Sequence, residues 1–430
     1  MKKLTKILII ILTVVLVIGS ITAFFLLRDK PVPVNYTNMP ANLVASAVGH
    51  EGIDEDFPTD RYSLVYNNAD GTKTMYVYTH PISFLNDDGQ LHIIDNEIVE
   101  NENGWNNKAS EIKTVFKQDK LSASFREHSV TLDLPVCDDA GLSDIQTILG
   151  NKQQAVQYNF NGFTLSAYPA YLGMKCQLNL PEPLNKTLSF PLHTELEVDT
   201  NNDFYIQFLD SSYNVAALLY HPIIKDSDGK IVRLMNGLVY ENGEVTLDLS
   251  ELEDVKYPVS IEFTLNMYQK KQADSSILSG LPNSNQFLDK YLYAGYHDDM
   301  GDTASLLRFE TSLYKTIKAD KVISAQYHFS GLNIIKNNTL KVIECDKDWA
   351  STKVTWNTKD RYEKIIGEVK NVDNNYSCDI AELVKKWITG EVNSHLGFQI
   401  IGEELAEGVI FPSADNGYCS PILIVHFEVD

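Results

Sequence analysis

The sequence has 430 residues, of which 44% are hydrophobic and 22% charged, and a formal net charge of −22 at pH 7. The first 28 residues hold four basic and no acidic side chains, which leaves the rest of the chain at −26. A surface this acidic repels nucleic acid, and no Lys/Arg cluster is present to neutralise phosphates, so composition argues against DNA or RNA as a partner.

An apolar stretch at residues 7–27 predicts a transmembrane helix. At 1.5 Å per residue its 21 residues cover the roughly 30 Å hydrocarbon core of a bilayer. Lys2, Lys3 and Lys6 precede it, so residues 1–28 are expected to form a cytoplasmic tip and a signal anchor, with the rest of the chain extracellular. The alternative is a cleaved signal peptide, favoured by the small residues at 20–23, which makes the protein secreted.

Residues 29–57 predict an extracellular tether, because they carry several prolines and no sustained apolar period. The following region predicts β-structure. Residues 62–66 and 75–78 flank Asp70-Gly71, a hairpin signal that recurs at Asp88-Gly89, Asp228-Gly229 and Asn242-Gly243. Further strands are predicted at 206–209, 218–220, 245–249 and 259–263. We therefore expect a sandwich-like region over residues 58–270 that includes the first hairpin.

The five cysteines are too few and too widely spaced for a disulfide scaffold. Buried free thiols are the simplest interpretation. One or two pairs are also compatible with an extracellular location, and the odd number leaves at least one thiol unpaired.

One helix is predicted in the C-terminal part. Asp379 is a suitable N-cap residue, and Glu382 three residues later completes a capping box. Ile380, Leu383, Val384 and Trp387 form one apolar face, and Gly390 stands where a C-terminal cap belongs. Trp387 is expected to be a core residue.

Residue patterns over 273–430 resemble the DNRLRE domain in order and spacing. They are Asp348-Trp349, Thr355-Trp356-Asn357, Asp379-Ile380, Asn393, Gly397-Phe398 and Phe411-Pro412-Ser413. The resemblance implies a jelly-roll module of bacterial surface proteins that is also grouped with carbohydrate-binding modules. Residues 78–98 are similar to the segment that precedes such domains in wall-associated and Rhs-type proteins of Gram-positive bacteria. The expected fold class is therefore all-β: an N-terminal transmembrane helix, a β-sandwich-like region, and a C-terminal jelly-roll sandwich that carries one short helix.

No motif for a catalytic site is present. The sequence lacks GxSxG, HExxH, GxxxxGK[ST] and GxGxxG patterns, and its histidines are scattered singly. Glycoside hydrolysis requires only two carboxylates about 5–10 Å apart, so the 58 acidic residues leave that alternative open. The sequence favours a non-enzymatic protein.

A ligand-binding platform is predicted at Tyr291, Tyr293 and Tyr296. The first two are two residues apart in a predicted strand, so both rings face outward if Leu292 points to the core. The alternative is that these tyrosines are buried under a loop or in a contact between domains. Trp349 and Trp356 are expected in the core, with Asn357 bonded to a backbone group.

The loop with Asp298, Asp299 and Asp302 suggests a structural Ca²⁺, a cation that prefers six to eight oxygen ligands. A solvated acidic loop is the alternative. The sequence as a whole predicts a non-catalytic cell-surface protein of a Gram-positive bacterium, bound to the membrane through its N-terminal helix, that recognises a polysaccharide of the cell envelope. A structural or adhesion module that docks a protein partner is the second hypothesis, and a glycan-active enzyme the third.

Overall fold

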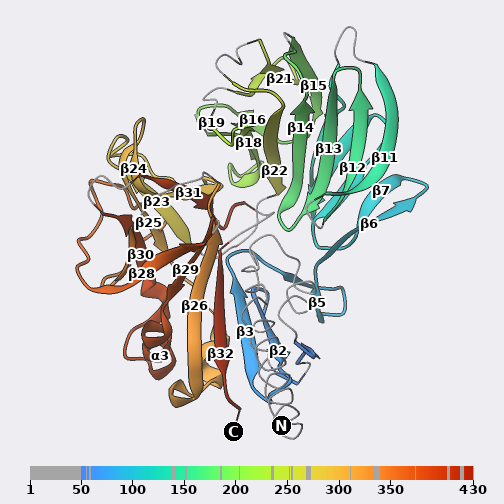
Figure 1. Ribbon diagram of the computed structural model, residues 1–430. Helices are drawn as coiled ribbons and strands as arrows, with labels where there is room; N and C mark the ends of the chain where they lie inside the picture. Colours follow the sequence, from blue (N-terminus) through green and yellow to red (C-terminus); the bar gives the residue numbers. More distant parts are fainter. Residues whose placement is uncertain are drawn as a thin grey trace, which may run out of the picture. The chain divides into compact units, whose positions relative to one another are not determined.

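The computed structural model describes residues 50–429, except for 55, 58–59, 137–140, 151–152, 185, 203, 234–236, 251, 253–254, 268–272, 310, 333–338, 373, 404–406 and 417–420. The predicted membrane span and most of the predicted tether lie outside this part of the chain. Within the described residues, no helix combines the length and the apolar character needed to cross a bilayer. Strands dominate, which confirms the predicted all-β class (Figure 1).

The middle of the chain forms two facing antiparallel sheets. The first contains, in spatial order, β20 (Val239–Glu241), β21 (Glu244–Asp248), β15 (Thr187–His193), β10 (His128–Asp133), β9 (Lys120–Phe125), β8 (Lys113–Phe116), β7 (Gly104–Ala109) and β6 (Asp95–Asn101). The second contains β11 (Leu142–Gly150), β12 (Gln153–Phe160), β13 (Phe163–Ala170), β14 (Gly173–Leu180), β22 (Val259–Met267), β18 (Val215–Lys225), β17 (Tyr205–Leu209) and β16 (Glu197–Asp199), with β19 (Ile231–Arg233) on β18. A small hairpin of β4 (Ser83–Leu85) and β5 (Leu91–Ile93) stands apart from both.

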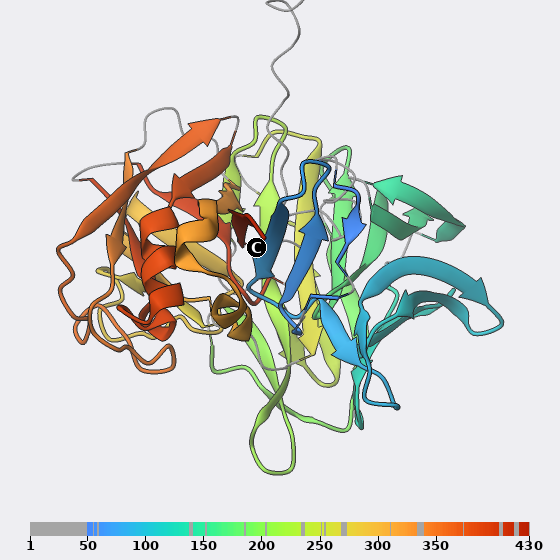
Figure 2. The same cartoon turned by 90° about the horizontal axis from the view of Figure 1, so that it is seen from below.

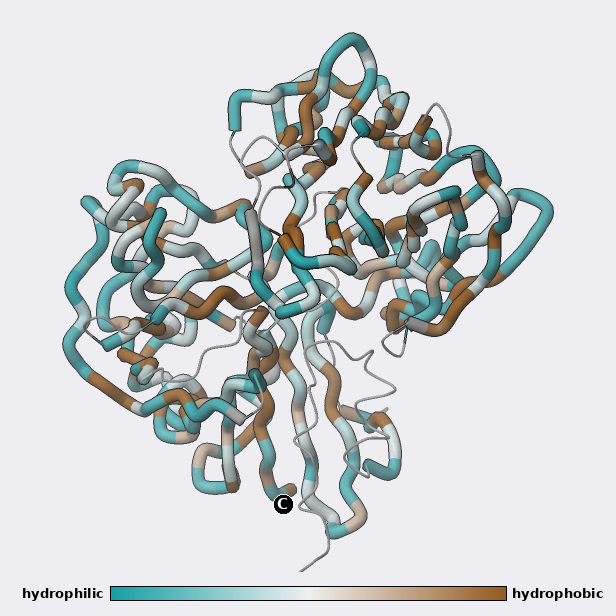
Figure 3. The backbone as a smooth tube through the Cα atoms, turned by 45° about the horizontal axis from the view of Figure 1, so that its top comes forward, coloured by the Kyte–Doolittle hydropathy of each residue, from teal (hydrophilic) through white to brown (hydrophobic). Residues whose placement is uncertain are grey.

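Alternating side chains from these two sheets build one core, to which Phe190 and Phe263 contribute an edge-to-face ring pair at 5.7 Å between centroids. Figure 3 colours many of the outer loops teal, for hydrophilic residues, and brown hydrophobic stretches recur along the chain between them. The predicted turns join the strands as expected. Asn242 and Gly243 both have positive φ, at 52° and 83°, and link β20 to β21 as the Asn-Gly signal predicts.

The C-terminal part forms a second sandwich from one continuous, folded sheet. Its spatial order is β1 (Gly52–Ile53), β2 (Ser63–Asn67), β3 (Lys73–Tyr78), β32 (Ile422–Phe427), β26 (Val322–Ser330), β29 (Asn375–Asp379), β28 (Ile365–Val372), β27 (Leu340–Glu344), β30 (Phe398–Gly402), β25 (Gly301–Leu307), β24 (Tyr291–His297) and β31 (Val409–Pro412), with β23 (Asp274–Leu278) on β25. Strand β28 pairs with both β29 and β27, so it connects the two layers. Side chains from both layers meet in a shared core.

The first hairpin belongs to this second sandwich. The sequence patterns placed residues 63–78 with the region that follows them, yet β3 pairs antiparallel with β32, from Lys73 opposite Phe427 to Tyr78 opposite Ile422. Figures 1 and 2 show the hairpin beside the C-terminal strand. Met75 and Val77 are fully buried in the core of the C-terminal sandwich. This assignment corrects the expectation, because local turn signals do not report which distant strand completes a sheet.

The predicted helix is α3 (Ala381–Thr389), which packs on β26; short 3₁₀ turns lie at Ser312–Thr316, Ala319–Lys321 and Ser394–Leu396. Leu383, Val384 and Trp387 are buried, and Gly390 ends the helix at φ 75°, as predicted. The capping box does not form. Asp379 accepts a hydrogen bond from the Ala381 amide at 2.9 Å, but the Glu382 carboxylate pairs with Lys385, also at 2.9 Å.

Cys176, Cys345 and Cys378 are buried free thiols, as expected. Burial raises the pKa of Cys176 and Cys378 to about 12. The other two cysteines, Cys137 and Cys419, lie outside the described residues.

Candidate functional site

The layer formed by β27, β30, β25 and β23 carries apolar side chains on both of its faces. Leu307, Ile400 and Val342 point into the core of the C-terminal sandwich. Their alternating neighbours Leu306 and Ile343 face the opposite side. Because both faces are apolar, the outer face needs a cover of its own.

Residues 345–362 supply that cover. Trp349, Val354 and Tyr362 of this segment are buried on the outer face, where each is 6–7% exposed. The segment therefore lies over half of the layer as an ordered arm, which we call the covering segment (residues 345–362).

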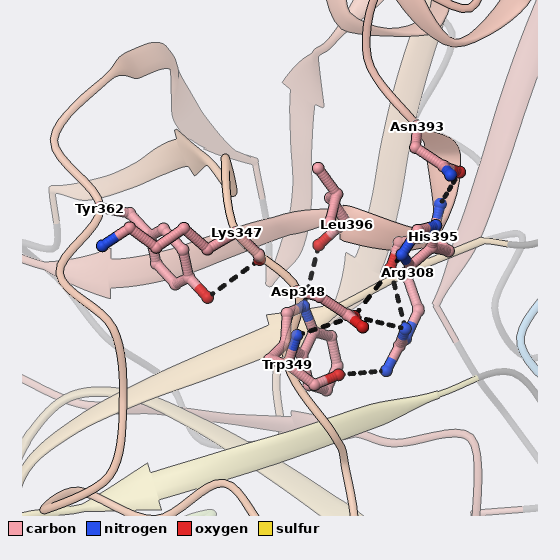
Figure 4. A network of polar contacts seen from close by, with 8 residues as sticks. All are labelled: Arg308, Lys347, Asp348, Trp349, Tyr362, Asn393, His395 and Leu396. Atoms are coloured by element: carbon pink, nitrogen blue, oxygen red, sulfur yellow. Dashed lines mark hydrogen bonds and ion pairs between the residues drawn. The ribbon is translucent and has the colours of Figure 1, made fainter.

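A polar network centred on Arg308 fixes the start of the covering segment (Figure 4). The guanidinium of Arg308 donates to the carbonyl of His395 at 2.9 Å and to that of Trp349 at 2.6 Å, and it stacks 4.3 Å from the Trp349 ring centroid. The indole N–H of Trp349 donates to the Leu396 carbonyl at 2.8 Å. These contacts confirm the structural role expected for Trp349.

The residue that follows Leu396 in this polar network must be glycine. Gly397 has a φ of 67°, and a Cβ atom at this position would overlap the carbonyl oxygen of Leu307. Asn393 accepts a hydrogen bond from the His395 amide at 3.2 Å and so orders the turn before Gly397. The Asn and Gly-Phe pattern at 393–398 therefore has a structural explanation.

A second set of bonds fixes the tip of the covering segment. The Asn285 side chain donates to the carbonyls of Ser351 and Val354, each at 2.7 Å. Asn357 bonds a backbone group, as expected, because its backbone N–H donates to the Pro282 carbonyl at 3.0 Å. Its side-chain Nδ2 donates to the side chain of Asn283 at 2.8 Å.

Between the covering segment and the exposed half of the layer lies a groove of about 470 Å³. Its floor comes from strand residues, among them Thr303, Ala304, Ile343, Gln399 and Ile401. Its walls carry the aromatic residues Trp356 and Tyr362 and the charged residues Asp302, Lys359, Asp360, Arg361 and Glu403. An apolar floor with aromatic walls and several polar groups is the usual composition of a ligand site.

Several charged groups of the groove wall are already paired. Glu403 binds Lys341 at 2.6 Å, which raises the pKa of that lysine, and Asp360 binds Lys347 at 3.1 Å. Arg361 pairs with Glu363 at 3.3 Å. The groove therefore presents polar groups that are partly paired with neighbours and still accessible, which suits recognition of hydroxyl groups.

The predicted tyrosine platform is not accessible. Strand alternation is as expected, since Leu292 points to the core and Tyr291 and Tyr293 to the other face, but these two tyrosines are only 2% and 1% exposed. Ile223 of β18 packs against them. The expectation of two outward-facing rings is therefore wrong, and burial in a contact between the sandwiches is correct. Tyr296 is 42% exposed and lies at the end of β24.

The three aspartates of the 298–302 loop are not brought together as a metal site. Among the described residues, no group of three or more His, Cys, Asp and Glu side chains could hold a metal ion. Burial lowers the pKa of His297, and the charges of Asp298 and Asp299 offset only part of this lowering. Asp302 lies in the wall of the groove instead.

One protein-family model matches the region that contains the groove. Residues 266–427 match the model of carbohydrate-binding module family 96. The matched residues include every residue of the groove and of the covering segment. It supports carbohydrate binding as the function of the C-terminal part. No curated protein matches the chain.

The sequence named two residues of the groove, but in other roles. Trp356 was assigned to the core and Asp302 to a calcium site, whereas Tyr362, Gln399 and Glu403 were not singled out. No spacing signal joins these residues, because Tyr362 comes from the covering segment and Gln399 and Glu403 from β30 and the residue after it, and the two segments meet only in the folded protein.

Proposed function

We propose that the groove of the C-terminal sandwich binds a glycan chain without cleaving it. The observation that carries the proposal is the half-buried indole of Trp356, which lines the groove together with polar side chains, within residues that match a carbohydrate-binding family. Sugars expose apolar C–H faces that pack on aromatic rings, and their hydroxyl groups need donors and acceptors nearby. Trp356 supplies the ring, and Asp302 and Gln399 supply oxygen and nitrogen atoms.

We also propose that the apolar segment 7–27 anchors the protein in the membrane of a Gram-positive cell, and that the glycan belongs to the cell envelope. The length of the segment and the basic residues before it support this location. The resemblance of residues 273–430 to the DNRLRE domain supports the surface role.

Protein docking is the second candidate function. Strand β11 ends the nine-stranded sheet, and its Leu149 is 75% exposed. An edge strand with free backbone groups and exposed apolar residues can accept a strand from another protein. This surface lies in the first sandwich, outside the residues that match family 96.

The test compares two aromatic residues on glycan arrays. The full-length chain, held in a detergent without a sugar head group, is applied to bacterial wall and plant or algal polysaccharides. We expect retention on one glycan class and no release of shorter fragments. Trp356→Ala should weaken binding about 30-fold, the effect of losing about 2 kcal/mol at a central contact.

Tyr296→Ala is the matched control, because Tyr296 is an exposed aromatic residue of the same sandwich that does not line the groove. Its binding should equal that of the wild type. If Tyr296→Ala abolishes retention and Trp356→Ala does not, the groove is the wrong site. Silence of the wild type across the array favours protein docking, and fragment release favours an enzyme.

A further inference from the structure

The accessible ring of the groove is covered by a side chain of the protein itself. The ammonium nitrogen of Lys359 lies 3.0 Å from the centroid of the Trp356 ring. The same Nζ atom donates to the Trp356 carbonyl at 3.3 Å. A cation over an indole ring is attracted by the negative face of the π-system, so the electrostatic contribution of this contact is favourable.

The turn between the two residues holds Lys359 in place. The Lys359 amide donates to the Thr355 carbonyl at 2.9 Å, and the Thr355 amide donates to the hydroxyl of Thr358, also at 2.9 Å. Trp356 and Lys359 are therefore three residues apart in one ordered turn. This spacing directs the lysine stem back over the indole.

Lys359 differs from most of the other charged residues of the groove wall in its partners. Asp360, Arg361 and Glu403 each have an ion-pair partner, whereas Lys359 has no carboxylate within ion-pair distance among the described residues. Burial lowers the pKa of Lys359, and the charge of Asp302 in the same groove offsets only part of this lowering. The ammonium thus has the ring and one carbonyl as its partners, and the charge of Asp302 acts on it from within the same groove.

We propose that Lys359 is a displaceable cover of the Trp356 ring, which a glycan must move aside before it stacks on the indole. The proposal rests on the proposed glycan-binding function of the groove. Lys359 is then a specificity-determining residue. A ligand is favoured when its own oxygen atoms accept the hydrogen bonds of the displaced ammonium, because the ammonium then exchanges one set of partners for another.

The first arm of the test needs no glycan. Acrylamide quenching of tryptophan fluorescence is measured for the wild type and for Lys359→Ala. It is then measured for the Trp356→Phe variant with and without Lys359→Ala, because Trp356→Phe removes the fluorescence of the Trp356 ring. Lys359→Ala should increase the quenching constant of the wild-type background and leave that of the Trp356→Phe background unchanged. Lys353→Ala, an exposed lysine of the same segment, should change neither.

The second arm measures affinity for the glycan class retained on the array. Removal of the cover should lower the Kd of Lys359→Ala about two- to five-fold, since a ligand no longer competes with an exposed cation–π contact. Lys353→Ala should keep the wild-type Kd.

Two results would overturn the proposal. Unchanged quenching in Lys359→Ala shows that the ring face is not covered, and a raised Kd shows that Lys359 is a ligand contact and not an obstruction. If no glycan is retained by any variant, the proposed function fails, and the quenching arm alone still decides whether Lys359 covers Trp356. Circular dichroism of each variant confirms that the fold is kept.

Discussion

The hairpin of β2 and β3 lies almost 350 residues before β32, the strand with which it pairs, and a change in its buried side chains should weaken the C-terminal sandwich specifically. Met75 is fully buried in the core of this sandwich, and Val425 of β32 is its partner on the neighbouring strand. Met75→Ala deletes three heavy atoms there. Large-to-small substitutions at buried Met, Leu or Ile positions cost about 2–5 kcal/mol, the sum of lost transfer energy and of the cavity.

Hydrogen exchange measured by mass spectrometry locates the effect. Met75→Ala should speed amide exchange in β32 and β26, which pair with each other next to β3. A loss of about 3 kcal/mol should also lower the melting temperature of a unit of this size by roughly 6–12 °C. Leu165→Ala is the control, because Leu165 is equally buried in the core of the first sandwich. It should speed exchange in β13 and β14.

The reasoning fails if Met75→Ala leaves exchange in β32 at the wild-type rate, or if it loosens β13 while β32 stays protected. The practical consequence concerns fragments. A fragment confined to the matched residues 266–427 would leave β32 as an uncovered edge strand, with a row of unpaired backbone groups. Binding experiments therefore need the hairpin as well as the matched residues.

Three further predictions follow from buried side chains. Trp349→Ala should cost about 3–5 kcal/mol in chemical denaturation, whereas Trp356→Ala, at the half-buried groove wall, should cost less than half of that; equal losses would contradict the assignment of Trp349 alone to the core. Burial lowers the pKa of His80 from 6.5 to about 3, so the unfolded chain takes up a proton below pH 6.5 that the folded chain refuses. The contribution of neutral His80 to stability is fully present above pH 6.5 and is lost as the pH falls. In urea titrations, the free energy of unfolding of the wild type should fall by about 2 kcal/mol more at pH 5 than that of His80→Phe; parallel pH curves for the two proteins would refute this. Cys176 and Cys378 should resist iodoacetamide in the native protein and react after unfolding, as read by peptide mass spectrometry, and fast native labelling of either would show an accessible thiolate.

Local elements of this fold were predictable because their signals are local. The apolar face of α3 and Gly390 at its end lie within three turns of helix, and the Asn242-Gly243 turn needs only its own two dihedral angles. Alternation in β24 also assigned Leu292 to the core correctly. The capping box failed because the N-cap position is Ile380, one residue later than predicted, and the Glu382 carboxylate pairs with Lys385.

The candidate site was less predictable for a physical reason. Whether the face that carries Tyr291 and Tyr293 is open depends on Ile223, a residue of another sheet about 70 positions earlier. Trp356 and Asp302 meet in one groove because β25 and the covering segment lie side by side, which no spacing in the chain records.

The sequence by itself determined the all-β class, the one α-helix of the described residues and the positions of the hairpin turns of the chain. Each of these depends on neighbouring residues and on the period of apolar side chains. The tertiary structure decided which strands share a sheet and which aromatic rings remain accessible. Pairing of β3 with β32 joins the two ends of the described chain, Tyr291 and Tyr293 are buried, and Trp356 is a half-buried ring of the groove. These properties arise from contacts between distant segments, and such contacts form only when the whole core is assembled.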